Sequence, residues 1–242
     1  MDSAMASRNS RIVSANATHC AALIPCRNEA GTIADVVRGA RMHLDTVIVV
    51  DDASQDDTLS RARAAGAVVL RQDVHRGKGA SLAEGWTEAA RRGFHWVLHL
   101  DGDGQHSTDD IPRFLSASTE QIPLWIGNRF NNPAAIPWGR RVVNRWMSRQ
   151  VSQLAGTSIP DSQCGYRLMH LPTLMSLSLH TQHFEIESEM CVAFARAGKR
   201  IGFVPVEVRY GAEVSKISPL RDAIRWWRWY ASVRRGQKTV TS

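Results

Sequence analysis

The chain has 242 residues, of which 43% are hydrophobic and 22% are charged, and its 30 Lys and Arg residues outnumber its 23 Asp and Glu residues to give a formal net charge of +7. This length and composition are those of a folded globular protein with one sizeable core, and they exclude an unfolded chain. The positive charge suits an anionic partner, which can be a nucleic acid, a lipid surface or a phosphorylated small molecule, and the sign alone does not choose among them.

The first 18 residues are polar and lack the apolar run of a signal peptide, so we expect a mobile tail over 1–18. No later window approaches the length of a membrane span. The four cysteines show neither C-x-x-C spacing nor a histidine at zinc-finger spacing. This argues against a disulfide framework or a structural metal and favours reduced thiols in a cytosolic protein.

Short apolar runs alternate with helical patterns through the first half of the chain. Continuous β-branched strands separated by helices are typical of an α/β fold, with a mostly parallel sheet that helices cover on both faces. We expect Ser54 to be the N-cap of the second helix, with acidic residues in its first turn. The expected strands are 20–25, 46–52, 68–70 and 95–101, and the expected helices are 31–42, 54–66 and 78–92.

The second half is less regular and shows no internal repeat. Pro205 lies inside its last strand and indicates an edge strand or a bulge. We divide the chain into the tail 1–18, one α/β domain over 19–217, and a basic, Trp-rich helix and tail over 218–242. The patterns predict helices over 111–118, 138–154 and 185–197, short strands over 124–127 and within 161–169, and a strand over 201–210.

Three of the expected strands end in polar clusters. These are P-C-R-N-E at 25–29, D-D-A-S-Q-D-D-T at 51–58 and D-G-D-G-Q-H at 101–106. Ligands of parallel sheets bind beyond the carboxyl ends of the strands, so we expect the three clusters to meet at one edge of the sheet.

Two carboxylates one residue apart, Asp101 and Asp103, follow the fourth strand. Like charges at this spacing repel unless a cation or a shared proton lies with them, and Mg²⁺ or Mn²⁺ prefers such oxygen ligands together with substrate phosphates. Gln105 adds an amide oxygen, and Gly102 lets the backbone approach a ligand closely. Asp and Gly are also common turn residues, but the acidic ends of two neighbouring strands favour a site here.

These motifs resemble those of family 2 glycosyltransferases with the GT-A fold. The resemblance rests on I-P-C-R-N-E, V-V-D-D-A-S-Q-D-D-T, R-G-K-G-A-S, D-G-D-G-Q-H and G-N-R-F, in that order along the chain. Four later motifs, D-S-Q-C-G-Y-R-L, F-E-I-E-S-E-M, V-P-V-E-V-R-Y and E-V-S-K-I-S-P, resemble the dolichyl- or polyprenyl-phosphate mannose synthase branch. The match runs from about residue 20 to about residue 230.

The resemblance implies roles for particular residues. Pro25, Glu29, Asp52, Lys78, Asp101 and Gly102 would bind the nucleotide of a UDP- or GDP-hexose. Asp103 and Gln105 would hold Mg²⁺ or Mn²⁺ at its diphosphate, with Arg129 and Lys216 near the phosphates. Arg167 and Arg209 would bind an acceptor phosphate, although each arginine taken alone can equally be a solvated surface charge.

The resemblance also implies an inverting transfer of the hexose to a polyprenyl phosphate or another membrane lipid. A lipid phosphate is already anionic and needs no strong base, whereas a hydroxyl acceptor on a cell-envelope glycan or lipid needs one, for which Glu187 is the candidate. Glu185, Glu187 and Glu189 alternate around one helix, so at least one is expected to be solvated. A non-catalytic nucleotide-binding module is a third possibility, which the D-G-D-G-Q cluster argues against.

The segment 219–235 has two contrasting faces when plotted as a helix. Arg221, Arg225, Arg228 and Arg235 form a narrow stripe, opposite a broad arc that includes Ile224, Trp227 and Tyr230. Such a helix can lie in the headgroup region of a membrane with its tryptophans buried there, or can pack its apolar face on the protein's own core. We expect peripheral contact with the inner face of the cytoplasmic membrane through 219–235 and no nucleic-acid partner. The oligomeric state is left open.

Overall fold

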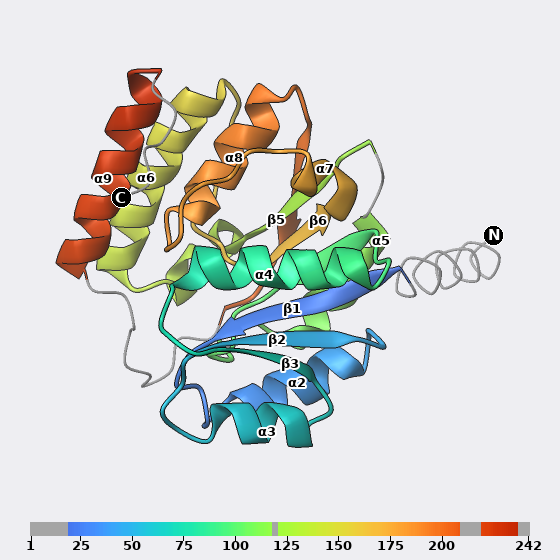
Figure 1. Cartoon of the computed structure of the whole chain (residues 1–242). Helices are drawn as coiled ribbons and strands as arrows, with labels where there is room; N and C mark the ends of the chain where they lie inside the picture. The colour runs from blue at the N-terminus through green and yellow to red at the C-terminus, as the bar shows by residue number, and fades with distance from the viewer. Residues whose placement is uncertain (1–18, 118–120, 209–218, 237–242) are drawn as a thin grey trace.

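The computed structural model describes residues 19–117, 121–208 and 219–236, and a seven-stranded sheet forms its centre (Figure 1). The strand order is β3-β2-β1-β4-β6-β5-β7. Four of the six strand pairings are parallel, and only β6 runs against its neighbours β4 and β5. The strands are β1 (Cys20–Cys26), β2 (Val47–Asp52), β3 (Val68–Gln72), β4 (Trp96–His99), β5 (Leu124–Asn128), β6 (Arg167–His170) and β7 (Ile201–Pro205).

Helices cover both faces of this sheet, which confirms the predicted α/β fold. In Figure 1, α4 crosses one face of β1 and β2, while α2 and α3 lie on the opposite side. Every residue of β1 and β2 is buried, as expected for strands covered on both faces. The helices are α2 (Ile33–Arg41), α3 (Thr58–Ala64), α4 (Lys78–Arg91), α5 (Ile111–Ala117), α6 (Trp138–Ala155), α7 (Leu171–Met175), α8 (Ile186–Arg196) and α9 (Pro219–Arg234).

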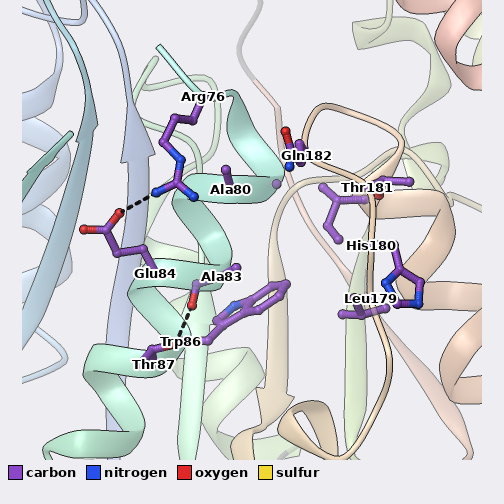
Figure 2. A pocket seen from close by; sticks show the side chains of 12 residues that line it. Arg76, Ala80, Ala83, Glu84, Trp86, Thr87, Leu179, His180, Thr181 and Gln182 are labelled. Atoms are coloured by element: carbon purple, nitrogen blue, oxygen red, sulfur yellow. Dashed lines mark hydrogen bonds and ion pairs between the residues drawn. The ribbon is translucent and has the colours of Figure 1, made fainter. Parts of the chain in front are cut away.

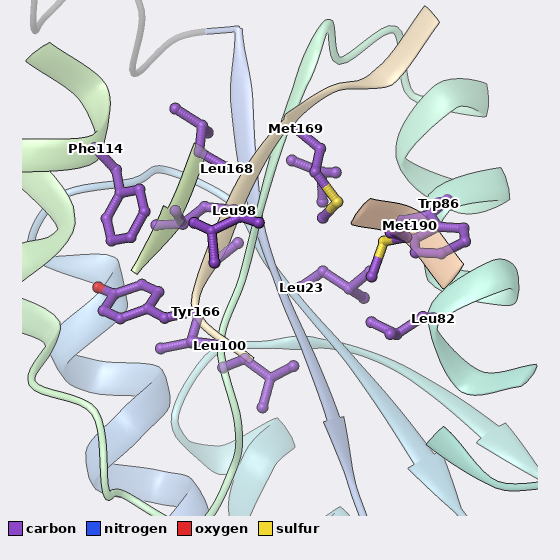
Figure 3. Packing of buried hydrophobic residues seen from close by; sticks show 14 of the residues in the cluster. Leu23, Leu82, Trp86, Leu98, Leu100, Phe114, Tyr166, Leu168, Met169 and Met190 are labelled. Atoms are coloured by element: carbon purple, nitrogen blue, oxygen red, sulfur yellow. The ribbon is translucent and has the colours of Figure 1, made fainter. Parts of the chain in front are cut away.

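The hydrophobic core continues through the sheet from one helical layer to the other. Leu23 of β1 lies toward Leu82 and Trp86 of α4, whereas Leu98 of β4 lies on the side of Phe114 of α5 (Figure 3). Gly85 allows the close approach of α4, since a Cβ atom there would lie 2.2 Å from a methyl carbon of Leu23. This packing fixes the start of α4 beside the carboxyl ends of the strands.

The second expected helix begins later than its sequence pattern indicates. It starts at Thr58 with Asp57 at the N-cap, so the prediction of Ser54 as N-cap is wrong. The Ser54 hydroxyl instead bonds the carboxylate of Asp51 and accepts a hydrogen bond from the backbone N–H of Asn28. Ser54 therefore joins two strand ends rather than capping a helix.

The last strand lies at the edge of the sheet, as Pro205 predicted. It ends at Pro205 instead of continuing to 210, and Val208 makes an isolated bridge with His106. The four cysteines are buried free thiols, in agreement with the absence of disulfide spacing in the sequence.

The helix at 219–234 packs against the protein along one of its faces. Trp226, Trp229 and Tyr230 are buried, and the Trp226 indole N–H donates to Ser188 Oγ of α8 at 2.9 Å. The Tyr230 hydroxyl reaches Gln150 Oε1 of α6 at 2.9 Å. Two of the three tryptophans assigned to membrane contact are therefore committed to the core. None of the helices in the described part of the chain has the length and apolar character needed to cross a lipid bilayer.

Candidate active site

The three polar strand ends meet at one edge of the sheet, as the sequence predicted. The backbone N–H of Glu29 donates to Thr58 Oγ1 at 2.7 Å, and the backbone N–H of Gln55 donates to the side chain of Asn28 at 2.8 Å. Thr32 Oγ1 donates to the carbonyl of Gly102 at 2.7 Å. The ends of β1, β2 and β4 are thus tied into one polar edge.

A lysine lies between two carboxylates at this edge. Lys78 Nζ is 2.7 Å from Asp101 Oδ1 and 2.6 Å from Glu187 Oε1, and its side chain is 11% exposed. Burial by itself would lower the pKa of Lys78, but the two carboxylates outweigh it and raise that pKa above its ordinary value. The charge of Lys78 likewise keeps the pKa of Asp101 low although burial opposes this.

Asp103 lies at the same edge with much less compensation. Burial first, and the negative charge of Asp101 second, raise the pKa of Asp103 to about 7. Its Oδ1 accepts one backbone hydrogen bond, from the N–H of Gln105 at 3.0 Å. A carboxylate in this position favours a cation beside it.

The donor set is that of a partial site for a hard divalent ion. Among the described residues, no three His, Cys, Asp or Glu side chains are grouped so as to hold a metal ion by themselves. Mg²⁺ in substrate-phosphate sites usually takes only one or two carboxylates from the protein, with phosphate and water completing its shell. Asp103 and Asp101 fit that pattern, and Gln105 lies next to them in the chain.

Asp52 is buried and organises the loop that leads into α4. Its carboxylate accepts the backbone N–H groups of Arg76 at 2.6 Å and Gly77 at 2.9 Å, and it contacts His75 Nδ1 at 2.7 Å. These bonds hold the turn that delivers Lys78 to the site. The expected contact of Asp52 with the nucleotide stays a prediction.

Glu187 and Glu189 of α8 and Glu185 at its N-cap are all buried, so the expectation that one is solvated is wrong. Glu187 pairs with Lys78 at the site. Glu189 points elsewhere and accepts the backbone N–H groups of His180 and Thr181 at 2.8–3.1 Å. Burial raises the pKa of Glu185, one of whose oxygens has no hydrogen-bond partner.

Two of the three arginines predicted to contact phosphates, Arg129 and Arg167, have partners inside the protein. Arg129 makes a two-pronged ion pair with the buried Asp161, with N–O distances of 2.7 and 2.8 Å. Arg167 is fully buried and donates to the carbonyls of Ser162, Cys164 and Glu187 at 2.7–2.9 Å. We therefore assign Arg167 a structural role in place of the expected contact with an acceptor phosphate, since no part of it reaches solvent.

The remaining predicted residues fall into two groups. Pro25 is buried at the end of β1, Gly102 packs against Cys26 at the end of that strand, and Glu29 and Gln105 are partly exposed at the same edge. Lys216 and Arg209 lie outside the described residues.

Sequence reasoning missed three residues that shape this edge. His99, the last residue of β4, is fully buried with its Nε2 3.7 Å from Asp101 Oδ1, and burial holds the pKa of its imidazole well below the usual value. Burial also lowers the pKa of His106 to about 4. Asp161 anchors Arg129. The only signal in the sequence was that His106 and Asp161 lie inside the matching motifs and that His99 lies two residues before one of them, because side chains this deeply buried are normally apolar.

A pocket of about 490 Å³ lies between α4 and the 179–182 segment (Figure 2). Arg76 pairs with Glu84 at one side of it, at 3.9 Å, and Trp86 lies on its floor between α4 and the segment. Asp101, Asp103 and Glu187 do not line this pocket, so it is separate from the carboxylate cluster.

Comparisons with known proteins agree with this geometry. The Glycosyl transferase family 2 model matches residues 21–174. Glycosyltransferase AglJ of Haloferax volcanii is 34% identical over 205 residues, which are 83% of this chain and 67% of that protein. The undecaprenyl-phosphate mannosyltransferase of Micrococcus luteus is 31% identical over 177 residues, 66% of this chain and 70% of that protein.

A solved structure shares the fold. The glucosyl-3-phosphoglycerate synthase of Mycobacterium tuberculosis, crystallised with Mg²⁺ and uridine diphosphate, superposes with a TM-score of 0.72. The sequences are 22% identical, and the superposition covers 96% of this chain and 84% of that one. The sheet described above is therefore GT-A-like.

Proposed function

This chain belongs to glycosyl transferase family 2, and from that premise we propose that it is an inverting, metal-dependent enzyme that transfers a hexose from a UDP- or GDP-sugar to a polyprenyl phosphate. The undecaprenyl-phosphate mannosyltransferase that it resembles supports this acceptor class by its name. The observation that carries the proposal is the cluster of Lys78, Asp101, Asp103 and Glu187 where three strand ends meet.

The reaction breaks the bond between the anomeric carbon and the donor's phosphate oxygen while an acceptor oxygen attacks from the opposite face. The nucleoside diphosphate leaves with the bonding electrons, so negative charge grows on its phosphate. A divalent ion, when bound, stabilises this charge. Asp103 would hold that ion, with Asp101 beside it and Gln105 near, while Lys78 keeps Asp101 charged and fixed in place.

The environment of Glu187 favours a phosphate acceptor over a hydroxyl. Glu187 Oε1 already accepts a hydrogen bond from Lys78 Nζ at 2.6 Å, whereas a general base needs a carboxylate oxygen available to the acceptor hydroxyl. An anionic phosphate makes no such demand. With a phosphate acceptor, Glu187 orients Lys78. The second candidate function is transfer to a hydroxyl acceptor with Glu187 as base, because the Glu187 carboxylate lies at the site.

We expect the enzyme to act at the inner face of the cytoplasmic membrane, where a polyprenyl phosphate resides. The purified chain, incubated with a panel of nucleotide sugars, undecaprenyl phosphate and Mn²⁺, should release one nucleoside diphosphate and form one radiolabelled glycolipid. Chelation by EDTA should stop both. Release without any labelled lipid, or labelling of a glycan hydroxyl instead, would contradict the proposed acceptor.

A further inference from the structure

Two neighbouring helices expose most of the apolar side chains found at the protein's surface. Nine large hydrophobic side chains of the described residues are exposed, and six of them belong to α6 or α9. We refer to these six as the α6–α9 surface. They are Trp138, Val142, Val143 and Trp146 of α6, with Ile224 and Trp227 of α9.

Four of the six side chains lie together. Trp138, Val142 and Trp146 are four residues apart along α6, which puts them in one stripe. The rings of Trp146 and Trp227 are 5.9 Å apart between centroids and join this stripe to α9. Figure 1 shows α6 and α9 standing side by side at the edge of the molecule.

The same two helices carry the net charge of the chain. They hold eight arginines and one aspartate, a net of seven positive charges, which equals the formal net charge of all 242 residues. The rest of the sequence is therefore neutral in sum. Arg149 and Arg228 are among the exposed arginines of α6 and α9. The charge that distinguishes this protein is concentrated where its apolar side chains are exposed.

We propose that the α6–α9 surface binds an anionic lipid bilayer, with its tryptophans and aliphatic side chains in the headgroup region and its arginines against acidic headgroups. The inference rests on the proposed function, which requires a lipid acceptor. The sequence led us to expect membrane contact through residues 219–235 alone, whereas the proposed surface includes both α6 and α9. Tryptophan favours the membrane interface, and basic helices are attracted to acidic lipid. A second copy of the chain is a poor occupant, because two such surfaces face to face would repel.

The α6–α9 surface is structurally connected to the candidate active site. Trp226 of α9 donates to Ser188, the residue after Glu187, and Glu187 contacts Lys78. These contacts link the buried face of α9 to the candidate active site.

Point variants test the surface better than removal of α9, because Trp226, Trp229 and Tyr230 belong to the core. Full-length protein should sediment with phosphatidylcholine vesicles that contain phosphatidylglycerol, and much less with phosphatidylcholine alone. Trp138→Ser combined with Val142→Ser should weaken this binding by about tenfold or more. Arg149→Gln combined with Arg228→Gln should weaken it by about as much, and added salt should weaken wild-type binding.

Matched controls remove the same kinds of group elsewhere. Met42 and Val74 are exposed far along the chain from these helices, and Arg63 and Arg71 are exposed arginines on α3 and β3. Met42→Ser with Val74→Ser, and Arg63→Gln with Arg71→Gln, should leave vesicle binding within about twofold of wild type. The thermal midpoint of unfolding should be the same in all variants as in wild type, which shows that they fold.

The outcomes separate the surface from the proposed function. Equal binding of wild type to neutral and anionic vesicles, or unaltered binding by both α6–α9 variants, overturns the inference. A wild-type dimer in gel filtration that Trp138→Ser with Val142→Ser dissociates also overturns it, in favour of self-association. If vesicle binding follows the expected pattern but no sugar reaches any lipid, the proposed function fails and the surface stands.

Discussion

The candidate active site and the α6–α9 surface both depart from the usual distribution of polar and apolar groups, in opposite directions. At the site, Lys78 and Glu187 are ionisable groups with side chains only 11% and 7% exposed. On the α6–α9 surface, Trp138 and Trp227 are 73% and 55% exposed. Both arrangements cost folding free energy, because buried charge loses hydration and exposed aromatic surface stays in water.

The two regions differ in where the compensation comes from. The buried charges of the site are paired with one another inside the chain, and Asp103 is the exception whose pKa is raised to about 7. The exposed tryptophans of the surface gain from each other only through ring contacts such as that of Trp146 with Trp227. The charged groups of the site are thus balanced within the chain except at Asp103, whereas the proposed completion of the surface is an external partner.

The largest effect is expected at Asp103. Asp103→Asn should lower transfer by about a thousandfold or more, because the charge that holds the metal against the leaving diphosphate is lost. The thermal midpoint should be unchanged or slightly higher, since the substitution also removes repulsion with Asp101. Asp109→Asn, an exposed neighbour, is the control and should transfer normally. Transfer by Asp103→Asn within about tenfold of wild type would exclude the metal role.

The next largest effect tests the internal pairing. Lys78→Met leaves Asp101 and Glu187 buried without their shared cation, and should lower the free energy of unfolding by about 3–5 kcal/mol in urea denaturation. Adding Glu187→Gln should recover part of this loss. Arg113→Met removes a cation that is half exposed beside Asp110, and should cost about 1 kcal/mol or less. If Lys78→Met and Arg113→Met lower the free energy of unfolding by the same amount, the buried ion pairs of Lys78 contribute no more than the half-exposed pair of Arg113.

Most of the fold could be predicted from the sequence, because buried strands and amphipathic helices leave periodic patterns. The strands β1, β2 and β4 and the meeting of their ends followed from apolar runs and from the geometry of parallel sheets. The hydrogen-bond partners that a polar side chain selects could not be predicted in the same way. Ser54 has the residue type of an N-cap but bonds Asp51 and Asn28, and nothing in the neighbouring sequence shows that choice.

The site could be predicted as a set of residue types but not as a set of contacts. Asp101, Glu187 and Lys78 were each named, yet their meeting depends on residues 109 positions apart in the chain. The resemblance implied that Arg167 binds an acceptor phosphate, but the structure gives it three carbonyl partners instead. Burial of an arginine is rare, so nothing in the sequence indicated it. The sequence pattern of α9 shows apolar residues opposite arginines, and this does not show that they divide into two faces. In the structure Trp226, Trp229 and Tyr230 are buried, whereas Ile224 and Trp227 are exposed.

A pH series sharpens the contrast, because the site titrates and the arginines of the surface do not. His106, with its pKa lowered to about 4 by burial, stays neutral in the folded state while the unfolded state takes up a proton below its ordinary pKa of 6.5. The contribution of His106 to the free energy of unfolding therefore falls as the pH drops from about 6.5 to about 4, by roughly 1.4 kcal/mol per pH unit.

His106→Phe should accordingly reduce the pH dependence of unfolding measured in urea at pH 7 and pH 5. The comparison with wild type is needed because Asp103 also affects the free energy of unfolding over this pH range. Since its pKa is raised, its effect has the opposite sign to that of His106. Binding of wild type to anionic vesicles should change little between these two pH values, since arginine stays charged. A variant whose unfolding keeps the full wild-type slope would show that His106 does not titrate as its burial implies.

The smallest effect separates the two acceptor classes. If the acceptor is a phosphate, Glu187→Gln should change transfer by less than about threefold, because glutamine can still accept a hydrogen bond from Lys78 and no proton has to be removed. If the acceptor is a hydroxyl, the same substitution removes the general base and should lower transfer by about 10²–10⁴-fold. Glu185→Gln, at the N-cap of the same helix, is the control and should have little effect on either reaction. The measurement is the initial rate of transfer to undecaprenyl phosphate in anionic vesicles, and a loss of a hundredfold there would mean that Glu187 acts on the acceptor itself rather than through Lys78.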